Sequence, residues 1–133
     1  MKLIVCVDNN LGMAFNHRRQ SMDRAVRARM LARVGGALLW MTAYSAKQFT
    51  EPVENLQVDE DCQRLAGAGE YCFAETAITV APEQVEELIL YRWGRDYPAD
   101  VHFSLPLEQF HLVEQTQFEG YSHPNITEEI YRK

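Results

Sequence analysis

Residues 16–24 read Asn16-His17-Arg18-Arg19-Gln20-Ser21-Met22-Asp23-Arg24, and they lead into a segment with helical periodicity. A continuous apolar run, Leu3-Ile4-Val5-Cys6-Val7, precedes this stretch, and a second run, Ala37-Leu38-Leu39-Trp40-Met41, follows it. Continuous apolar runs of this length, rich in β-branched residues in the first case, are typical of buried strands. Strand, helix and strand in this order predict a right-handed βαβ unit with parallel pairing.

The helix is expected to run from about residue 22 to residue 34. Ser21 is a favourable N-cap, and Gly35-Gly36 offers the left-handed conformation that ends many helices. Asp23 then falls in the first turn, where the helix dipole favours a negative charge. At 100° per residue Asp23 also lies on the apolar side of the helix. A carboxylate on that side must be paired, protonated or functional.

Other strands are expected where apolar residues are continuous or alternate with polar ones. We place them at residues 56–58, 71–74, 87–93, 109–118 and 126–131, with short helices at 42–50, 59–66 and after Pro82. The last two strands flank turn residues and predict an antiparallel hairpin. No linker or repeat interrupts the 133 residues, so we expect one domain over residues 1–133. The predicted fold is α/β, with a mixed, mostly parallel sheet, helices on both faces and a C-terminal hairpin.

Charge is unevenly spread along the chain. The net charge is −6, yet residues 18–33 contain six arginines and one acid. Such a segment attracts an anion locally, while the acidic remainder repels polyanions. On a helical wheel Arg29 and Arg33 lie away from Arg24 and Arg27, so no continuous nucleic-acid stripe is implied. The alternative is a solvated face with salt bridges. Arg18 and Arg19, which precede the helix, are the best anion-binding candidates.

Several classes of protein are not favoured by the sequence. No apolar run reaches the length of a membrane span, and no secretory signal is visible. The three cysteines have no Cys-x-x-Cys spacing and predict reduced thiols and a cytoplasmic location. The four histidines lack metal-ligand spacing, so no metal site is expected. Ser21 and Ser45 lie in no nucleophile motif.

Several segments, taken in chain order, resemble parts of one known enzyme family. They are residues 3–13, Ser21-Met22-Asp23, residues 88–91 with 99–103, and residues 118–123 with 130–132. In this order they resemble the opening strand and turn, the acidic helix start, the late strands and the closing hairpin of dihydrofolate reductase. The resemblance covers most of the chain. It implies a shortened dihydrofolate-reductase-like fold, with a strand and a helix missing between Phe49 and Leu56.

The chain departs from this family where the resemblance implies cofactor binding. The family's phosphate-binding Gly-Arg/Lys-x-Thr turn is matched by Thr42-Ala43-Tyr44-Ser45. Its Gly-Gly-Gly turn is matched by Glu75-Thr76-Ala77, and a carboxylate there would repel a pyrophosphate. Arg27 stands where the family has a folate-contacting aromatic, and Tyr91 where it has a threonine behind the acid. We therefore expect no NADPH and no other cofactor.

The leading interpretation is a divergent dihydrofolate-reductase-like protein without reductase activity. It would bind a small anionic or heterocyclic ligand, or a protein partner. The residues expected at the site are Arg18, Arg19, Asp23, Arg27, Tyr44, Glu75 and Tyr91. Asp23 is either a catalytic or ligand-gripping acid, or a structural acid paired with Arg27 one turn away.

Two other functions stay open. One is an active NADPH-dependent pterin reductase with Asp23 as proton donor. The other is a binder or hydrolase of RNA or phosphate esters that uses residues 18–33. Whether the protein is an enzyme is left undecided. An exposed sheet edge would allow a homo-oligomer.

Overall fold

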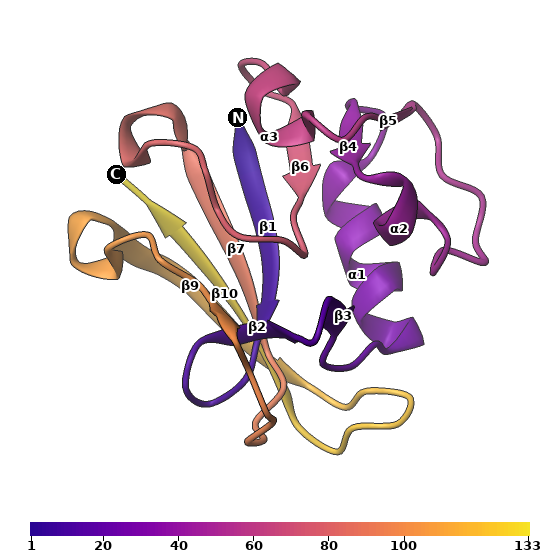
Figure 1. Cartoon of the computed structure of the whole chain (residues 1–133), viewed down its shortest axis with the longest axis vertical. Coiled ribbons are helices and arrows are strands. Elements are labelled where there is room, and N and C mark those ends of the chain that lie inside the picture. Colours follow the sequence, from indigo (N-terminus) through magenta and orange to yellow (C-terminus); the bar gives the residue numbers. More distant parts are fainter.

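Seven strands form the central sheet of the computed structural model, which describes residues 1–133 (Figure 1). Their order is β5-β4-β6-β1-β7-β10-β9. The strands are β1 (Lys2–Val7), β4 (Leu39–Met41), β5 (Leu56–Val58), β6 (Tyr71–Phe73), β7 (Glu87–Arg92), β9 (His111–Phe118) and β10 (Ile126–Arg132). The five neighbouring strands β5, β4, β6, β1 and β7 pair in parallel. Strand β10 is antiparallel to both β7 and β9. The mostly parallel sheet and the C-terminal hairpin are confirmed.

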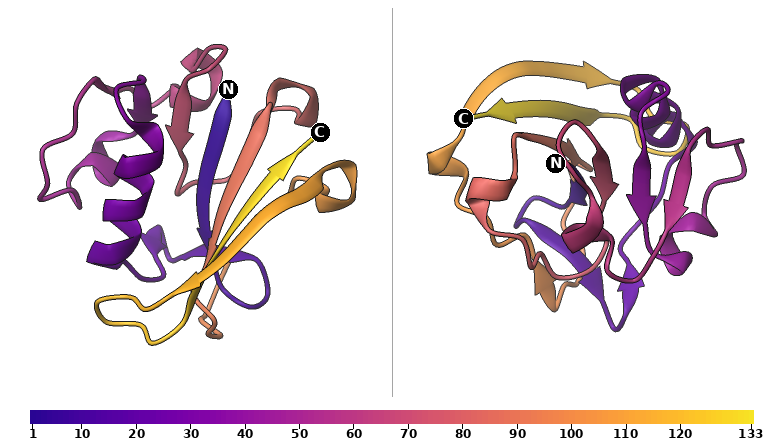
Figure 2. Two further views of the ribbon diagram at one scale, coloured as in Figure 1. Left: turned by 180° about the vertical axis from the view of Figure 1, so that it is seen from behind. Right: turned by 90° about the horizontal axis from the view of Figure 1, so that it is seen from above.

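Helix α1 (Arg24–Val34) lies between β1 and β4 in the chain and packs on one face of the sheet (Figure 2). Its N-cap is Asp23, whose side chain accepts a hydrogen bond from the Ala25 N–H, and it ends at Gly35 with a φ of 58°. The prediction of Ser21 as the N-cap is wrong, because the Ser21 hydroxyl hydrogen-bonds to His123. The predicted direct pairing of the two strands beside the helix is also wrong, since β6 lies between β1 and β4.

The opposite face of the sheet has little helix. It is covered by the single turn of α3 (Cys62–Leu65), by the 3₁₀ turns Pro82–Gln84 and Leu107–Gln109, and by a small second sheet. That sheet has the order β3-β2-β8 and consists of β2 (Gly12–Phe15), β3 (Arg18–Arg19) and β8 (Val101–His102). Helices lie on both faces, as expected, but α1 on one face is much longer than α3 on the other.

Residues 12–19, for which no strand was predicted, form the β2–β3 hairpin of this small sheet. Its two turn residues, Asn16 and His17, have φ values of 51° and 62°. Asparagine and histidine enter this left-handed region more readily than most residues. The hairpin turns the chain back across the ends of the parallel strands before α1 begins (Figure 1).

Pleat alternation divides the core into two layers. Leu3 and Val5 of β1 pack against the small sheet, whereas Ile4 packs toward α1 with Val26 and Met30. The apolar side of α1 therefore packs against the sheet, and the first turn of the helix lies near the edge where the parallel strands end. None of the helices is long and apolar enough to cross a bilayer.

Candidate functional site

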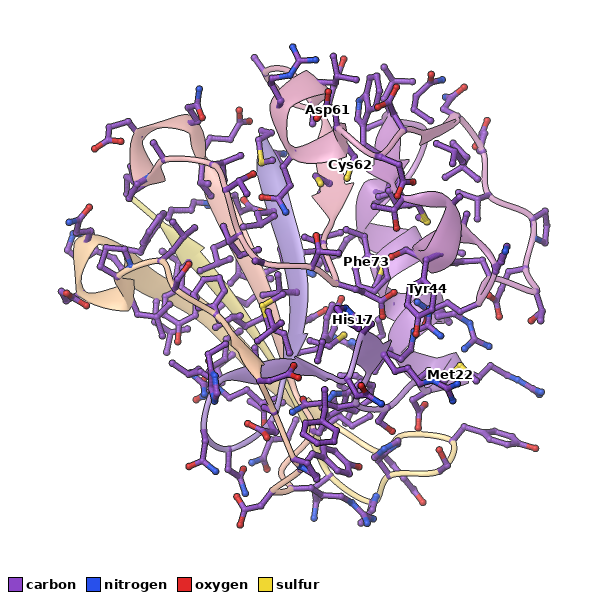
Figure 3. The ribbon with its side chains drawn as sticks, in the orientation of Figure 1. His17, Met22, Tyr44, Asp61, Cys62 and Phe73 are labelled. Carbon is purple, nitrogen blue, oxygen red and sulfur yellow. The ribbon has the colours of Figure 1, made fainter.

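A cavity of about 440 Å³ lies at the carboxyl ends of the parallel strands β4 and β6. The β2–β3 hairpin, the start of α2 (Ala43–Ala46) and the loop after β6 supply its walls. Arg18, Arg19, Tyr44 and Glu75 are among its lining residues. Figure 3 shows His17 of the hairpin turn and Tyr44 of α2 on this side of the molecule. Open α/β sheets bind ligands at this edge, so the position is that of a ligand site.

Arg19 is the most tightly held cation of the cavity. Its Nε and Nη2 donate to the two carboxylate oxygens of Glu75 at 2.9 and 3.2 Å, and its guanidinium lies 4.2 Å from the centre of the Tyr44 ring. Ser45 Oγ and Gln48 Nε2 donate to the same carboxylate at 2.8 and 3.1 Å. Glu75 is thus neutralised by Arg19. The Nη1 group of Arg19 makes no hydrogen bond within the protein and is available to a ligand.

The other charged residues of the cavity are less constrained. Arg18 is exposed and forms no salt bridge, so its charge is free. Glu60 also lines the cavity, and its carboxylate accepts a hydrogen bond from the Ala43 N–H at 3.0 Å. With Glu75 already paired, the free charged donors of the cavity come from Arg18 and Arg19. The chemistry offered is that of a guanidinium pair beside an aromatic ring.

Asp23 is buried outside this cavity, 3% exposed. One carboxylate oxygen accepts from the N–H groups of Ala25 and Tyr121 at 2.8 and 2.9 Å. The other accepts from Ser122 N at 2.9 Å, Ser122 Oγ at 3.2 Å and His123 Nδ1 at 2.8 Å. Burial acts to raise the pKa of Asp23, but these hydrogen bonds outweigh it and hold the pKa well below its usual range. Asp23 is therefore ionised at neutral pH and is not a proton donor there.

The expected pair of Asp23 with Arg27 is wrong. Arg27 Nε donates instead to Glu51 at 2.9 Å, because the loop after α2 brings that acid to the side of the helix. Asp23 and Arg27, together with Ser21, line a void of about 10 Å³ between α1 and the sheet. Such a void holds at most a single water. Glu75 lines both this void and the cavity, so the two are neighbours.

Tyr91 lies away from both spaces. Its ring is fully buried in the core, and its hydroxyl donates to Glu128 at 2.8 Å. Glu128 also accepts from Arg29 at 2.9 Å and from Arg33 at 3.1 Å. Burial acts to raise the pKa of Glu128, but bonds to Arg33, Arg29 and Tyr91 lower it to about 2. Burial beside this carboxylate raises the pKa of Tyr91. The group is a structural network, not part of a ligand site.

The structure thus divides the predicted site residues. Arg18, Arg19, Tyr44 and Glu75 meet at the cavity, whereas Asp23, Arg27 and Tyr91 do not line it. No three His, Cys, Asp or Glu side chains gather closely enough to hold a metal ion.

His123 was not predicted from the sequence as a site residue, although its buried ring contacts both Ser21 and Asp23. The only signal in the sequence was its place in a Gly- and Pro-containing turn between the last two strands. A turn of this kind predicts a reversal of the chain but not the distant residue that the turn contacts.

No protein-family model matches the chain, and no curated protein is similar to it in sequence.

Proposed function

We propose that this protein is a divergent, dihydrofolate-reductase-like protein that binds a small anionic, planar ligand in the cavity at the ends of β4 and β6. The observation that carries the proposal is the Arg19 guanidinium, held by Glu75 over the Tyr44 ring with its Nη1 group free. A preorganised guanidinium loses little entropy when it binds a carboxylate or phosphate. The cavity volume of about 440 Å³ lies in the range of small-molecule sites.

The cavity lies beside the two turns that the family resemblance assigns to the cofactor. Thr42 and Tyr44 belong to the first turn, and Glu75 with Thr76 and Ala77 to the second. This supports a ligand on the cofactor side of the molecule. It does not support folate binding beside Asp23, because the neighbouring void there has a volume of about 10 Å³.

The proposal excludes NADPH-dependent reduction. The Glu75 carboxylate occupies the turn where the family's glycines would let the backbone approach a pyrophosphate. Asp23 has a lowered pKa and is ionised at neutral pH, so it would not deliver the proton that a pterin reduction needs.

The nucleic-acid alternative has less support. Arg19, Arg27, Arg29 and Arg33 form salt bridges with acids of the same chain. Of the six arginines in residues 18–33, only Arg18 and Arg24 have no acidic partner. A protein that binds polyanions needs several free cations on one surface.

Thermal unfolding with a panel of ligands tests the proposal. The panel contains AMP and UMP, which share the phosphate and differ in the base, together with dihydrofolate and NADPH. A mononucleotide at about a hundredfold excess over its dissociation constant stabilises by roughly 2.7 kcal/mol, which raises the midpoint by about 3–6 °C. We expect the shift to be lost in Arg19→Lys, which keeps the charge but not the fork, and in Arg18→Ala.

Arg64→Ala is the matched control, because Arg64 is exposed and pairs with Asp61 outside the cavity. It should leave the shift unchanged. A shift with NADPH, together with oxidation of NADPH by dihydrofolate, would contradict the proposal and favour the reductase. A panel without any shift that depends on Arg19 would also contradict it.

A further inference from the structure

Ser21, His123 and Asp23 form a continuous chain of hydrogen bonds beside the first turn of α1. Ser21 Oγ lies 2.8 Å from His123 Nε2, and His123 Nδ1 lies 2.8 Å from Asp23 Oδ2. We propose that Ser21 is a nucleophile activated by this chain, and that the protein hydrolyses small carboxylic esters. The inference does not depend on the ligand-binding role of the cavity, because it needs none of the cavity's arginines.

The hydrogen bonds set the tautomer of His123. Asp23 is ionised and accepts only, so the proton of a neutral His123 lies on Nδ1. The lone pair of Nε2 then faces the Ser21 hydroxyl, which donates to it. This is the arrangement in which an imidazole acts as the general base of a serine nucleophile, recognised by geometry and not by sequence motif.

The ring of His123 is held in this position from several sides. Trp93 stacks on it with ring centroids 4.6 Å apart, and Tyr97 Oη lies 3.4 Å from Nε2. The turn before it needs Gly120, because a Cβ there would lie 2.7 Å from Asp23 Oδ2. An imidazole with a fixed orientation and tautomer is preorganised for proton transfer.

The exposed fraction of the three side chains differs along this series of hydrogen bonds, as a proton relay requires. Asp23 and His123 are 3% and 6% exposed, whereas Ser21 is only partly buried. A tetrahedral intermediate also needs donors for its oxyanion. The backbone N–H groups of Ser21 and Met22 form no hydrogen bond within the protein, so neither is committed to another acceptor. In Figure 3 the labelled Met22 marks this segment at the surface.

The reaction balances with water as the only co-substrate. Ser21 Oγ attacks the ester carbonyl carbon while its proton passes to His123 Nε2. The C–O bond to the alcohol breaks, and the alcohol leaves with that proton. Water then attacks the acyl-serine, gives a proton to His123 and releases the carboxylic acid, after which His123 returns the proton to Ser21. Asp23 stays ionised and stabilises the imidazolium in both halves.

The competing explanation is structural: the same bonds would merely tie the loop of residues 119–125 to the start of α1. Incubation with p-nitrophenyl acetate, and separately with an alkyl fluorophosphonate, distinguishes the two. We expect release of p-nitrophenol and one fluorophosphonate adduct per chain, located at Ser21 by peptide mass spectrometry. Ser21→Ala should abolish both, and His123→Gln should lower both rates by about a hundredfold or more. Ser104→Ala, which removes an exposed serine, should change neither.

A second variant at the same position, Ser21→Cys, tests the proposal even if Ser21→Ala fails to fold. Ser21→Cys keeps a nucleophile beside His123, so its thiol should react with iodoacetamide at least tenfold faster than that of Ser104→Cys. The proposal is overturned if the unaltered protein carries no adduct at Ser21 and Ser21→Cys reacts no faster than Ser104→Cys. A negative result in these labelling experiments does not contradict the proposed ligand binding, because the ligand panel measures a thermal shift that depends on Arg19.

Discussion

Asp23 illustrates how a single buried charge is accommodated. Its carboxylate lies on the apolar side of α1, where an unpaired charge would be costly. Instead of one cation it has donors from the helix start and from residues 121–123. Hydrogen bonds to an ionised group are stronger than those between neutral groups, so this set keeps the acid charged without Arg27.

At the same scale we predict the effect of Asp23→Asn. An amide accepts on one side only and places an NH₂ group against existing donors, so the free energy of unfolding should fall by about 2–3 kcal/mol. Because folding lowers the pKa of Asp23, the difference should be full above about pH 4 and should shrink as the pH falls further. Urea unfolding at several pH values measures both effects.

Asp61→Asn is the control for this substitution. Asp61 is exposed and pairs only with the exposed Arg64, so its replacement should change the free energy of unfolding by no more than about 0.5 kcal/mol. Equal losses in the two variants would show that the network around Asp23 contributes nothing beyond an ordinary surface charge.

At the scale of elements, the loop between β9 and β10 makes contacts with a distant helix that its position in the sequence does not predict. Residues 119–125 extend past the end of the hairpin to the first turn of α1 (Figure 1). The loop joins the antiparallel end of the sheet to the helix that packs on its parallel part. Gly120 permits this approach, because any Cβ there would meet Ile126 at 2.6 Å and the His123 carbonyl at 2.8 Å.

Gly120→Ala should therefore destabilise the protein. Overpacking at a closed position costs about 1–3 kcal/mol, and the displaced loop should also weaken the hydrogen bonds to Asp23. Thermal or urea unfolding measures the loss. Gly36→Ala provides the comparison, since nothing lies within 4 Å of its Cβ position. That variant should be unchanged or more stable by about 0.4–1 kcal/mol, and a similar loss there would refute the steric argument.

At the scale of the whole molecule, Glu128 joins α1 to the sheet. It lies on β10, 1% exposed, and accepts hydrogen bonds from Arg29 and Arg33 of the helix and from Tyr91 of β7. Its pKa falls from an ordinary value near 4.5 to about 2. A carboxyl whose pKa is lowered by folding stabilises the folded state above its unfolded pKa, and this stabilisation is lost as the pH falls toward the folded pKa.

We predict that the free energy of unfolding decreases as the pH falls from about 4.5 to about 2, and that Glu128→Gln lessens this slope. The variant should also be less stable at pH 7, because Arg29 and Arg33 lose their buried partner. Glu114→Gln removes an exposed partner of Arg33 and should change stability by no more than about 0.5 kcal/mol. An unaltered pH slope in Glu128→Gln would contradict the assignment.

Much of the architecture could be predicted because its signals are local. Apolar continuity located β1, β6 and β7 to within a residue or two, and alternation located the hairpin of β9 and β10. The β2–β3 hairpin was missed, since Asn16 and His17 read as loop residues and β3 has only two residues. In the site, Arg19, Tyr44 and Glu75 were named as candidates, but their mutual contacts were not foreseen.

Local sequence patterns are sufficient to predict the buried strands, the helix and the hairpin, because hydrophobic periodicity and turn chemistry act over a few neighbouring residues. Which side chains contact one another depends on how these elements pack in three dimensions. Asp23 takes His123, 100 residues away, instead of Arg27 one turn along, and Arg19 takes Glu75, 56 residues away. Hydrogen bonds are directional and short, so the packing of the sheet edge, the hairpin and the closing loop selects the partners.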